Sequence, residues 1–174
     1  MEQTIQIQFY PTRCGEIIIG AYDGKICLCD WKNRKNREAI DRRIQKGLNA
    51  TYVVKESPII RQAIMQLDEY FNKQRTTFDL PLLTVGTDFQ KKIWDLLLEL
   101  PYGTIESYLT LSRRFGDPNA VRAVSAANGA NAISIFIPCH RIIGSKGQLV
   151  GYAGGLEAKQ MLLDLESPEQ KLCF

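Results

Sequence analysis

The spacing of apolar residues changes along the chain, and this change limits the possible folds more than any other feature. Residues 4–9 alternate between polar and apolar, which is the period of a strand with one buried face. Residues 15–21 form a short apolar run, and residues 23–24 (Asp-Gly) are typical of a tight hairpin before a returning strand over 26–31. Beyond about residue 82, helical spacing replaces this pattern. Strands followed by helices predict an α+β fold in two parts.

Residues 79–82 (Asp-Leu-Pro-Leu) separate the two patterns and form the predicted linker. We therefore expect a small mixed α/β domain over residues 1–81 and a mainly helical domain over residues 82–174. In the first domain, residues 51–54 favour a further strand, and a Ser-Pro pair begins a helix over 57–73. The stripe of this helix that we expect to be buried consists of Ile60, Ile64, Leu67 and Phe71.

Capping signals divide the second domain into short helices. Thr87 is placed to cap the first helix, Gly116 ends the second, and Asp117-Pro118 has the cap and first-turn proline of a third. The predicted helices cover residues 88–100, 107–115, 118–128 and 156–166. Two short helices joined by a glycine-containing turn predict a helix-turn-helix, and the turn at 145–148 is short enough to form its wing.

Charge gives only a weak indication of the partner. The net charge is +3, with 13 basic and 10 acidic side chains in residues 1–81 and 9 of each in residues 82–174. A general grip on nucleic acid normally produces a strongly basic patch, which the second half lacks. Residues 32–46 are strongly basic, and we favour a solvated loop and helix face there over an auxiliary contact with DNA phosphates.

The cysteines and the N-terminus bear on the compartment. The five cysteines are odd in number and irregularly spaced, which does not fit a disulfide framework. The first residues lack the basic and then apolar pattern of a secretory signal, and no apolar run is long enough to span a membrane. We expect a cytoplasmic, monomeric protein with no membrane partner.

Residues 133–143 carry the features that indicate chemistry. An apolar run leads into Pro138-Cys139-His140-Arg141. Cysteine is a good nucleophile only as the thiolate, and a neighbouring base that accepts its proton activates it. His140 is the only histidine in the chain and directly follows Cys139. A Cys-His pair alone fits a buried cysteine beside a core histidine equally well, so the longer match decides.

The segment from Pro138 to Ile142 resembles the active-site signature Pro-Cys-His-Arg-Val of O6-alkylguanine-DNA alkyltransferases, also called methylated-DNA–protein-cysteine methyltransferases. The similarity covers about residues 84–167, and isoleucine for valine is a mild exchange. Further segments that match in the family's order are residues 89–94, 120–124 and 152–155. The resemblance implies a ribonuclease-H-like β-meander with helices in the first domain and a winged helix-turn-helix in the second.

The resemblance also implies a reaction. An alkyl group, such as methyl, would move from O6 of guanine in double-stranded DNA to Cys139, irreversibly and without a cofactor, so that each molecule acts once. His140, through a water, would take the thiol proton, and Glu166 would hold and polarise His140. Asn131 would lock the turn before the cysteine. Tyr108 would rotate the phosphate 3′ to the lesion and donate a hydrogen bond to the base.

The third predicted helix would bind the minor groove. An O6-alkyl group lies inside the base stack, so the nucleotide must be flipped into a pocket. Arg122 would enter the duplex and fill the gap, and small side chains around it allow a close approach to the groove. The other residues expected against DNA are Ala120, Ala123 and Ser125. The residues expected to wall the guanine pocket are Pro138, Tyr152, Ala153 and Gly154.

Two positions depart from the family pattern. Ala132 follows Asn131 where proline is frequent, which relaxes the turn but leaves the asparagine's hydrogen bonds. Ala153 stands where serine is frequent, which removes one hydroxyl donor to O6 and leaves a backbone N–H. Zinc ligands occur in the first domain of some relatives, but here the only histidine is His140, so we expect no metal site.

Three other functions compete with alkyl transfer. A lesion binder without chemistry would lack the cysteine, and Cys139 speaks against it. A cysteine hydrolase would use Cys139 and His140 as a dyad, but adjacent residues of an extended chain point to opposite sides. A plain helix-turn-helix regulator gives Cys139 no role.

Overall fold

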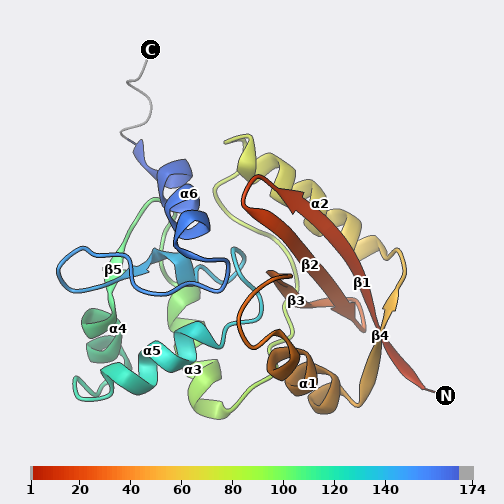
Figure 1. Ribbon diagram of the computed structural model, residues 1–174, viewed down its shortest axis with the longest axis horizontal. Helices are drawn as coiled ribbons and strands as arrows, with labels where there is room; N and C mark the ends of the chain where they lie inside the picture. Colours follow the sequence, from red (N-terminus) through yellow and green to blue (C-terminus); the bar gives the residue numbers. More distant parts are fainter. Residues whose placement is uncertain (1, 169–174) are drawn as a thin grey trace.

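The computed structural model describes residues 2–168, and Cys173, whose role the sequence leaves open, lies outside them. Four strands form one sheet in the order β3-β2-β1-β4 (Figure 1). The strands are β1 (Gln3–Thr12), β2 (Gly15–Tyr22), β3 (Lys25–Trp31) and β4 (Ala50–Val54). The first three are antiparallel neighbours, which confirms the predicted meander, and β4 pairs with β1 in parallel.

Helices α1 (Arg37–Leu48) and α2 (Pro58–Phe71) pack against opposite faces of this sheet (Figure 1). The alternation of side chains along β2 accounts for the two faces. Ile17 and Ile19 are buried in the cluster that includes α2, whereas Ile18 between them is buried with residues of α1. The isoleucine run is therefore a central strand that is apolar on both sides.

The buried face of α2 differs in part from the predicted stripe. Ile60 and Leu67 are fully buried as predicted, whereas Ile64 and Phe71 are only partly buried. The largest buried side chain of this helix is Tyr70, which the sequence pattern had not indicated. A tyrosine hydroxyl needs a partner when it is buried, and that partner lies far away in the sequence.

The second part of the chain is mainly helical. Its elements are α3 (Asp88–Leu98), β5 (Glu106–Ser107), α4 (Tyr108–Phe115), α5 (Val121–Gly129), the 3-10 turn η1 (Cys139–Arg141), β6 (Ile142–Ile143) and α6 (Leu156–Glu166). Thr87 and Gln90 form a capping box at the start of α3. Gly116 ends α4 with a φ of 104°, so α4 and α5 form the predicted helix-turn-helix.

Helix α5 begins at Val121 and not at Pro118, so its predicted start is wrong. The Asp117 carboxylate accepts a hydrogen bond from Asn119 N at 2.9 Å, and the Asp117 carbonyl accepts one from Ala120 N at 3.1 Å. The aspartate therefore caps a separate turn before the helix. Asp-Pro is a signal for both structures, and the sequence alone does not distinguish them.

The outer edge of β3 joins the two parts of the chain. Cys29 N donates to Ala132 O at 2.9 Å, and Ser134 N donates to Cys29 O at 2.6 Å. Nearer the start of β3, Ile26 forms backbone hydrogen bonds with residues 81–83. One large buried cluster also contains side chains from both parts. The sequence boundary between residues 81 and 82, which stays a prediction, is thus crossed by a continuous core.

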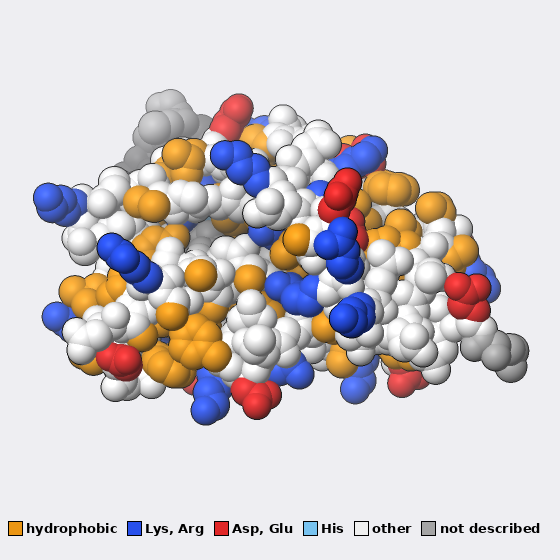
Figure 2. All heavy atoms as spheres, turned by 60° about the horizontal axis from the view of Figure 1, so that its bottom comes forward, with side chains coloured by type: hydrophobic (Ala, Val, Ile, Leu, Met, Phe, Trp, Pro, Cys, Tyr) orange, Lys and Arg blue, Asp and Glu red, His pale blue; other side chains and the backbone are white. Residues whose placement is uncertain are grey.

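The face that carries α1, α4 and α5 is turned forward in Figure 2. Lysine and arginine side chains gather near the middle of this view, around α1, whereas the part over α4 and α5 has isolated cations among apolar and uncharged atoms. No helix within residues 2–168 has the length and apolar character needed to cross a membrane.

Candidate active site

Asn131 shapes the loop that leads to the 3-10 turn. Its Nδ2 donates to Ile137 O at 2.9 Å, and its Oδ1 accepts from Ile133 N at 2.9 Å. Between these contacts Ile135 has a φ of 72°, a conformation that β-branched residues rarely adopt. The asparagine side chain therefore holds a tight loop closed, together with the backbone hydrogen bond from Ile137 N to Ile133 O.

Cys139 begins the 3-10 turn and is 3% exposed. It lines a cavity of about 650 Å³, within the usual range for sites that hold small molecules. Burial raises the pKa of Cys139, and the Asn131 side chain lowers it only in part, so the thiol keeps its proton at neutral pH. Because the turn is 3-10 and not extended, the strand-alternation objection to pairing Cys139 with His140 does not apply here.

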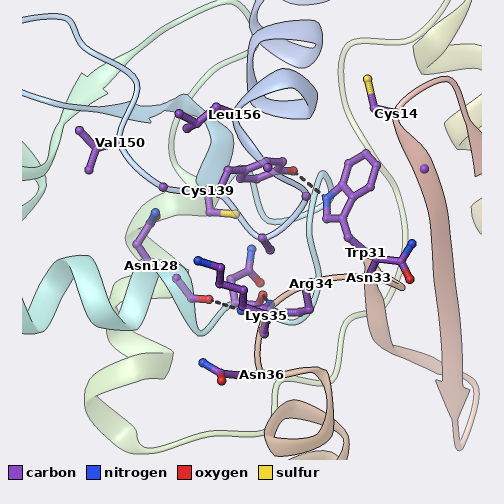
Figure 3. Close-up of a pocket in the computed structure, with 18 of the residues that line it drawn as sticks. Cys14, Trp31, Asn33, Arg34, Lys35, Asn36, Asn128, Cys139, Val150 and Leu156 are labelled. Atoms are coloured by element: carbon purple, nitrogen blue, oxygen red, sulfur yellow. Dashed lines mark hydrogen bonds between the residues drawn. The ribbon is translucent and has the colours of Figure 1, made fainter.

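Both parts of the chain line the cavity. Asn128 comes from α5, residues 150–156 form the loop that enters α6, and Trp31 and residues 33–36 come from the first domain. Figure 3 shows Cys139 between Asn128 and Trp31, with its sulfur directed into the space between them. The cavity therefore extends from the helix-turn-helix to the sheet.

Three of the four predicted pocket residues line the cavity: Tyr152, Ala153 and Gly154. The Tyr152 hydroxyl accepts a hydrogen bond from Trp31 Nε1 at 3.3 Å, and the two rings meet edge to face. Gly154 has no room for a side chain, because a Cβ there would lie 2.5 Å from the Trp31 ring. Pro138 is buried but is not among the residues that line the cavity.

Glu166, the last residue of α6, is 4% exposed and accepts five hydrogen bonds. Its Oε1 accepts from His140 Nε2 (2.9 Å), Arg141 Nη2 (2.9 Å) and the Tyr70 hydroxyl (2.7 Å). Its Oε2 accepts from Arg141 Nε (2.9 Å) and Gly103 N (3.3 Å). A carboxylate partner requires the proton of a neutral imidazole to be on Nε2, which leaves Nδ1 as the basic nitrogen. Nδ1 is buried and has no hydrogen-bond partner within residues 2–168.

These contacts determine which groups of the network carry protons. Burial disfavours the charged form of Glu166, but hydrogen bonds from His140 and Arg141 outweigh it and hold the pKa of Glu166 far below its ordinary value. Burial also lowers the pKa of His140, and Glu166 offsets this only in part. The site at neutral pH therefore contains a protonated thiol, a neutral imidazole and an ionised carboxylate.

Tyr108 and Lys159 share one backbone acceptor at the edge of the cavity. The hydroxyl of the half-buried Tyr108 donates to Val150 O at 3.0 Å, and burial raises the pKa of Tyr108 to about 12. Lys159 is fully buried, and its Nζ donates to Val150 O at 3.3 Å and to Gly151 O at 3.2 Å. The sequence did not single out Lys159, because lysine on a helix is usually exposed.

Helix α5 presents the residues that were predicted to face DNA. Arg122 and Ala123 are exposed, and Ala120 and Ser125 are partly exposed. Arg122 forms no hydrogen bond or ion pair with any described residue, whereas Ser125 also lines the cavity. The exposed face of α5 thus adjoins the cavity that contains Cys139.

The solvated face expected for residues 32–46 is wrong for three arginines, which are partly buried and form hydrogen bonds with the protein itself. Arg34 Nη2 donates to Gly129 O at 2.7 Å, and Arg43 Nη2 donates to Ala130 O at 2.8 Å. Both carbonyls lie at the C-terminal end of α5, where a cation is favourable because of the helix dipole. The basic segment therefore joins the first domain to the helix-turn-helix.

The third arginine, Arg37, meets Arg34 at the fully buried Asp30. Nη1 of Arg37 lies 3.0 Å from Asp30 Oδ2, and Nη1 of Arg34 lies 2.9 Å from the same oxygen. Arg34 also donates to Asn131 O at 3.2 Å. Burial raises the pKa of Asp30, and the two arginines offset this effect only in part. An aspartate within an apolar strand needs a buried partner, and this signal in the sequence could have revealed the network.

Two family models together match nearly all of the described chain. The 6-O-methylguanine DNA methyltransferase ribonuclease-like domain matches residues 5–84, and the DNA binding domain of the same family matches residues 88–168. The chain therefore has both domains of a DNA-repair methyltransferase in order. It also has a buried cysteine in a cavity beside the helix-turn-helix, and these features together define the class. The chain belongs to the 6-O-methylguanine DNA methyltransferase family.

Individual relatives agree with this assignment. The methylated-DNA–protein-cysteine methyltransferase of Methanosarcina barkeri is 48% identical over 113 residues, which are 65% of this chain and 72% of the relative. The constitutive enzyme of that name from Bacillus subtilis is 49% identical over 113 residues, or 64% and 68% of the two chains. The crystal structure of Mycobacterium tuberculosis OGT in complex with DNA has a TM-score of 0.79 at 34% identity and covers 92% of each chain. The predicted family and fold class are confirmed.

Proposed function

We propose that the chain repairs O6-alkylguanine in double-stranded DNA by moving the alkyl group to Sγ of Cys139, once per molecule. The observation that carries the proposal is the position of this sulfur in a cavity of about 650 Å³ that reaches the helix-turn-helix. The relatives carry the name of this activity, and one similar structure is a complex with DNA.

The reaction balances without a cofactor. The Cys139 thiol gives its proton, through a water, to Nδ1 of His140, while Nε2–H remains bonded to Glu166. Sγ attacks the alkyl carbon, the bond from this carbon to O6 breaks, and its electron pair goes to the guanine. A proton returns to the guanine, so the products are a thioether and an unmodified base. Tyr108 is a suitable hydrogen-bond donor to the departing base because it lines the cavity and its hydroxyl is protonated at neutral pH.

The proposed contacts with DNA are made by residues on the exposed face of α5. We propose that Arg122, exposed and unpaired among residues 2–168, fills the gap left by the flipped nucleotide. Ala120, Ala123 and Ser125 are small enough for the helix to approach the minor groove closely. Tyr152, Ala153 and Gly154 then line the pocket for the base. This mode needs few phosphate contacts, which agrees with the sparse cations over α4 and α5 (Figure 2).

The test is to incubate the protein with a duplex containing O6-methylguanine and to measure its mass and the modified residue. We expect the gain of one methyl per molecule, on Cys139. Cys139→Ser should bind the duplex and stay unmodified. Cys14→Ser is the matched control, because Cys14 is the other thiol in the same cavity and its loss should leave transfer intact.

Three outcomes would contradict the proposal. Binding of the duplex without a mass change would favour a lesion sensor. Repeated turnover of an ester or peptide, lost in Cys139→Ser, would favour a cysteine hydrolase. A methyl group found on Cys14 would mean that Cys139 is not the acceptor.

A further inference from the structure

Tyr70 reaches from the first domain into the hydrogen-bond network of the second. It lies near the end of α2, is fully buried, and its hydroxyl donates to Glu166 Oε1 at 2.7 Å. The same oxygen accepts the hydrogen bond from His140 Nε2 at 2.9 Å. The two donors therefore compete for the charge of one carboxylate oxygen.

The ring of Tyr70 is fixed by other aromatic side chains. Its centroid lies 5.3 Å from that of Phe71, 5.3 Å from that of Phe78 and 6.1 Å from that of Tyr102. Burial, and then the charge of Glu166, raise the pKa of Tyr70 well above its ordinary value. The hydroxyl therefore keeps its proton and acts on Glu166 only as a donor.

The position of Glu166 does not depend on Tyr70 alone. Arg141 donates to both carboxylate oxygens, and Gly103 N donates to Oε2. Without the Tyr70 hydroxyl these contacts would still hold the carboxylate against His140. The distinct effect of Tyr70 is therefore on charge, because each hydrogen bond to a carboxylate weakens its attraction for a neighbouring imidazolium.

We propose that Tyr70 acts through Glu166 to keep His140 neutral in the resting protein, so that the imidazole can accept the Cys139 proton. Tyr70 is thus a positioning residue that the first domain supplies to the site. For its catalytic consequence, this inference rests on the proposed function. It assigns the first domain a part in the reaction beyond support of the fold.

Other charged and titratable groups also face the imidazole. Arg141 on the 3-10 turn and Lys159 on α6 oppose its protonation, whereas Glu166 on α6 favours it. Tyr102, before β5, packs on the Arg141 guanidinium at 5.9 Å and carries a hydroxyl close to the network. These groups stay in place when only the Tyr70 hydroxyl is removed, so its effect can be isolated.

The direct test is a titration of the imidazole by NMR. His140 is the only histidine in the chain, so its ring signals are unambiguous. Tyr70→Phe removes the hydroxyl and keeps the packed ring, and we expect the pKa of His140 to rise by on the order of one unit. Tyr102→Phe is the matched control, because its hydroxyl donates to Leu165 O at 3.2 Å and not to Glu166. It should leave the titration unchanged.

A second measurement follows methyl transfer as a function of pH in single-turnover reactions. The rate rises with pH as His140 becomes neutral, and in Tyr70→Phe this rise should move to higher pH by the same amount while the plateau stays within about twofold. A titration of His140 in Tyr70→Phe that is unchanged or lowered would overturn the inference. If the wild type transfers no methyl, the proposed function fails, and the NMR titration still decides the effect of Tyr70 on His140.

Discussion

Glu166 and Asp30 are both buried carboxylates bound by arginine, yet their surroundings have opposite effects. Hydrogen bonds hold the pKa of Glu166 far below its ordinary value, whereas burial raises the pKa of Asp30. Glu166 has a titratable partner, His140, whereas the ion-pair partners of Asp30 are the permanently charged Arg34 and Arg37. A carboxylate beside a histidine can take part in proton transfer, and one between two arginines can only hold structure together.

The largest effect that this comparison predicts is on the reaction rate in Glu166→Gln. The neutral amide no longer stabilises the imidazolium that forms when His140 takes the thiol proton, so methyl transfer should slow by about 100-fold. Single-turnover kinetics, normalised to the number of molecules that finally become methylated, measures this. Glu157→Gln, on the exposed first turn of the same helix, should react at the wild-type rate. A normal rate in Glu166→Gln would mean that Glu166, like Asp30, only stabilises the fold and takes no part in proton transfer.

Asp30→Ala should show the opposite pattern, with a large loss of stability and little change in rate. Removal of the carboxyl group leaves the guanidinium groups of Arg34 and Arg37, whose side chains are 8% and 16% exposed, without the acceptor that they share. Loss of one partner of a buried ion pair costs about 3 kcal/mol. Urea unfolding measures the stability, and transfer by the folded fraction should stay within about threefold of wild type. A large fall in that rate at normal stability would contradict the division of roles.

Arg34→Met tests the contact between the domains with a smaller effect. It removes the hydrogen bonds to Gly129 O and Asn131 O and leaves Asp30 with Arg37 alone. The expected cost is about 2 kcal/mol of unfolding free energy, together with weaker binding of duplex DNA because the end of α5 is released. Arg42→Met, at an exposed position of α1, is the control and should change neither quantity. Equal effects of the two variants would mean that the segment acts only through its overall charge.

The smallest predicted effect is the pH dependence of stability. The pKa of Glu166 is lower in the folded state, so its stabilisation is complete above its ordinary pKa near 4.5 and is lost as the pH falls below that value. The pKa of Asp30 is higher in the folded state, so ionised Asp30 costs stability at neutral pH, and some is regained as the pH falls through its folded pKa. The stability advantage of wild type over Glu166→Gln should shrink toward acid pH, whereas that over Asp30→Ala should grow. Urea unfolding between about pH 7 and pH 3 checks both slopes.

The sequence predicts the helices and strands well because local signals determine them. The alternation before residue 10, the Thr87 cap and the last helix over 156–166 agree with the structure. The start of α5 was wrong because the Asp117-Pro118 signal also fits the turn that precedes the helix. Local patterns therefore predict that an element exists more reliably than where it begins.

For the candidate site, too, the sequence reveals the residues that are adjacent in the chain but not those that only the fold brings together. Cys139 and His140 are recognisable from their spacing and from the family signature, because they are adjacent in the chain. The contacts of Tyr70 and Arg34 join residues that are 96 and 95 positions apart, so no local pattern contains them. Each looked like an ordinary helix or loop side chain, and only packing of the two parts gives it a partner.

The hydrogen bonds along the outer edge of β3 determine how this protein can be divided. A fragment ending near residue 81 would expose unpaired N–H and C=O groups on β3, an open edge that promotes self-association. A fragment starting near residue 82 would lack Trp31, one wall of the cavity, and the hydroxyl of Tyr70. The two halves are separable in the sequence but form one working unit, and an exchange of first domains between relatives would have to preserve both the strand edge and these two side chains.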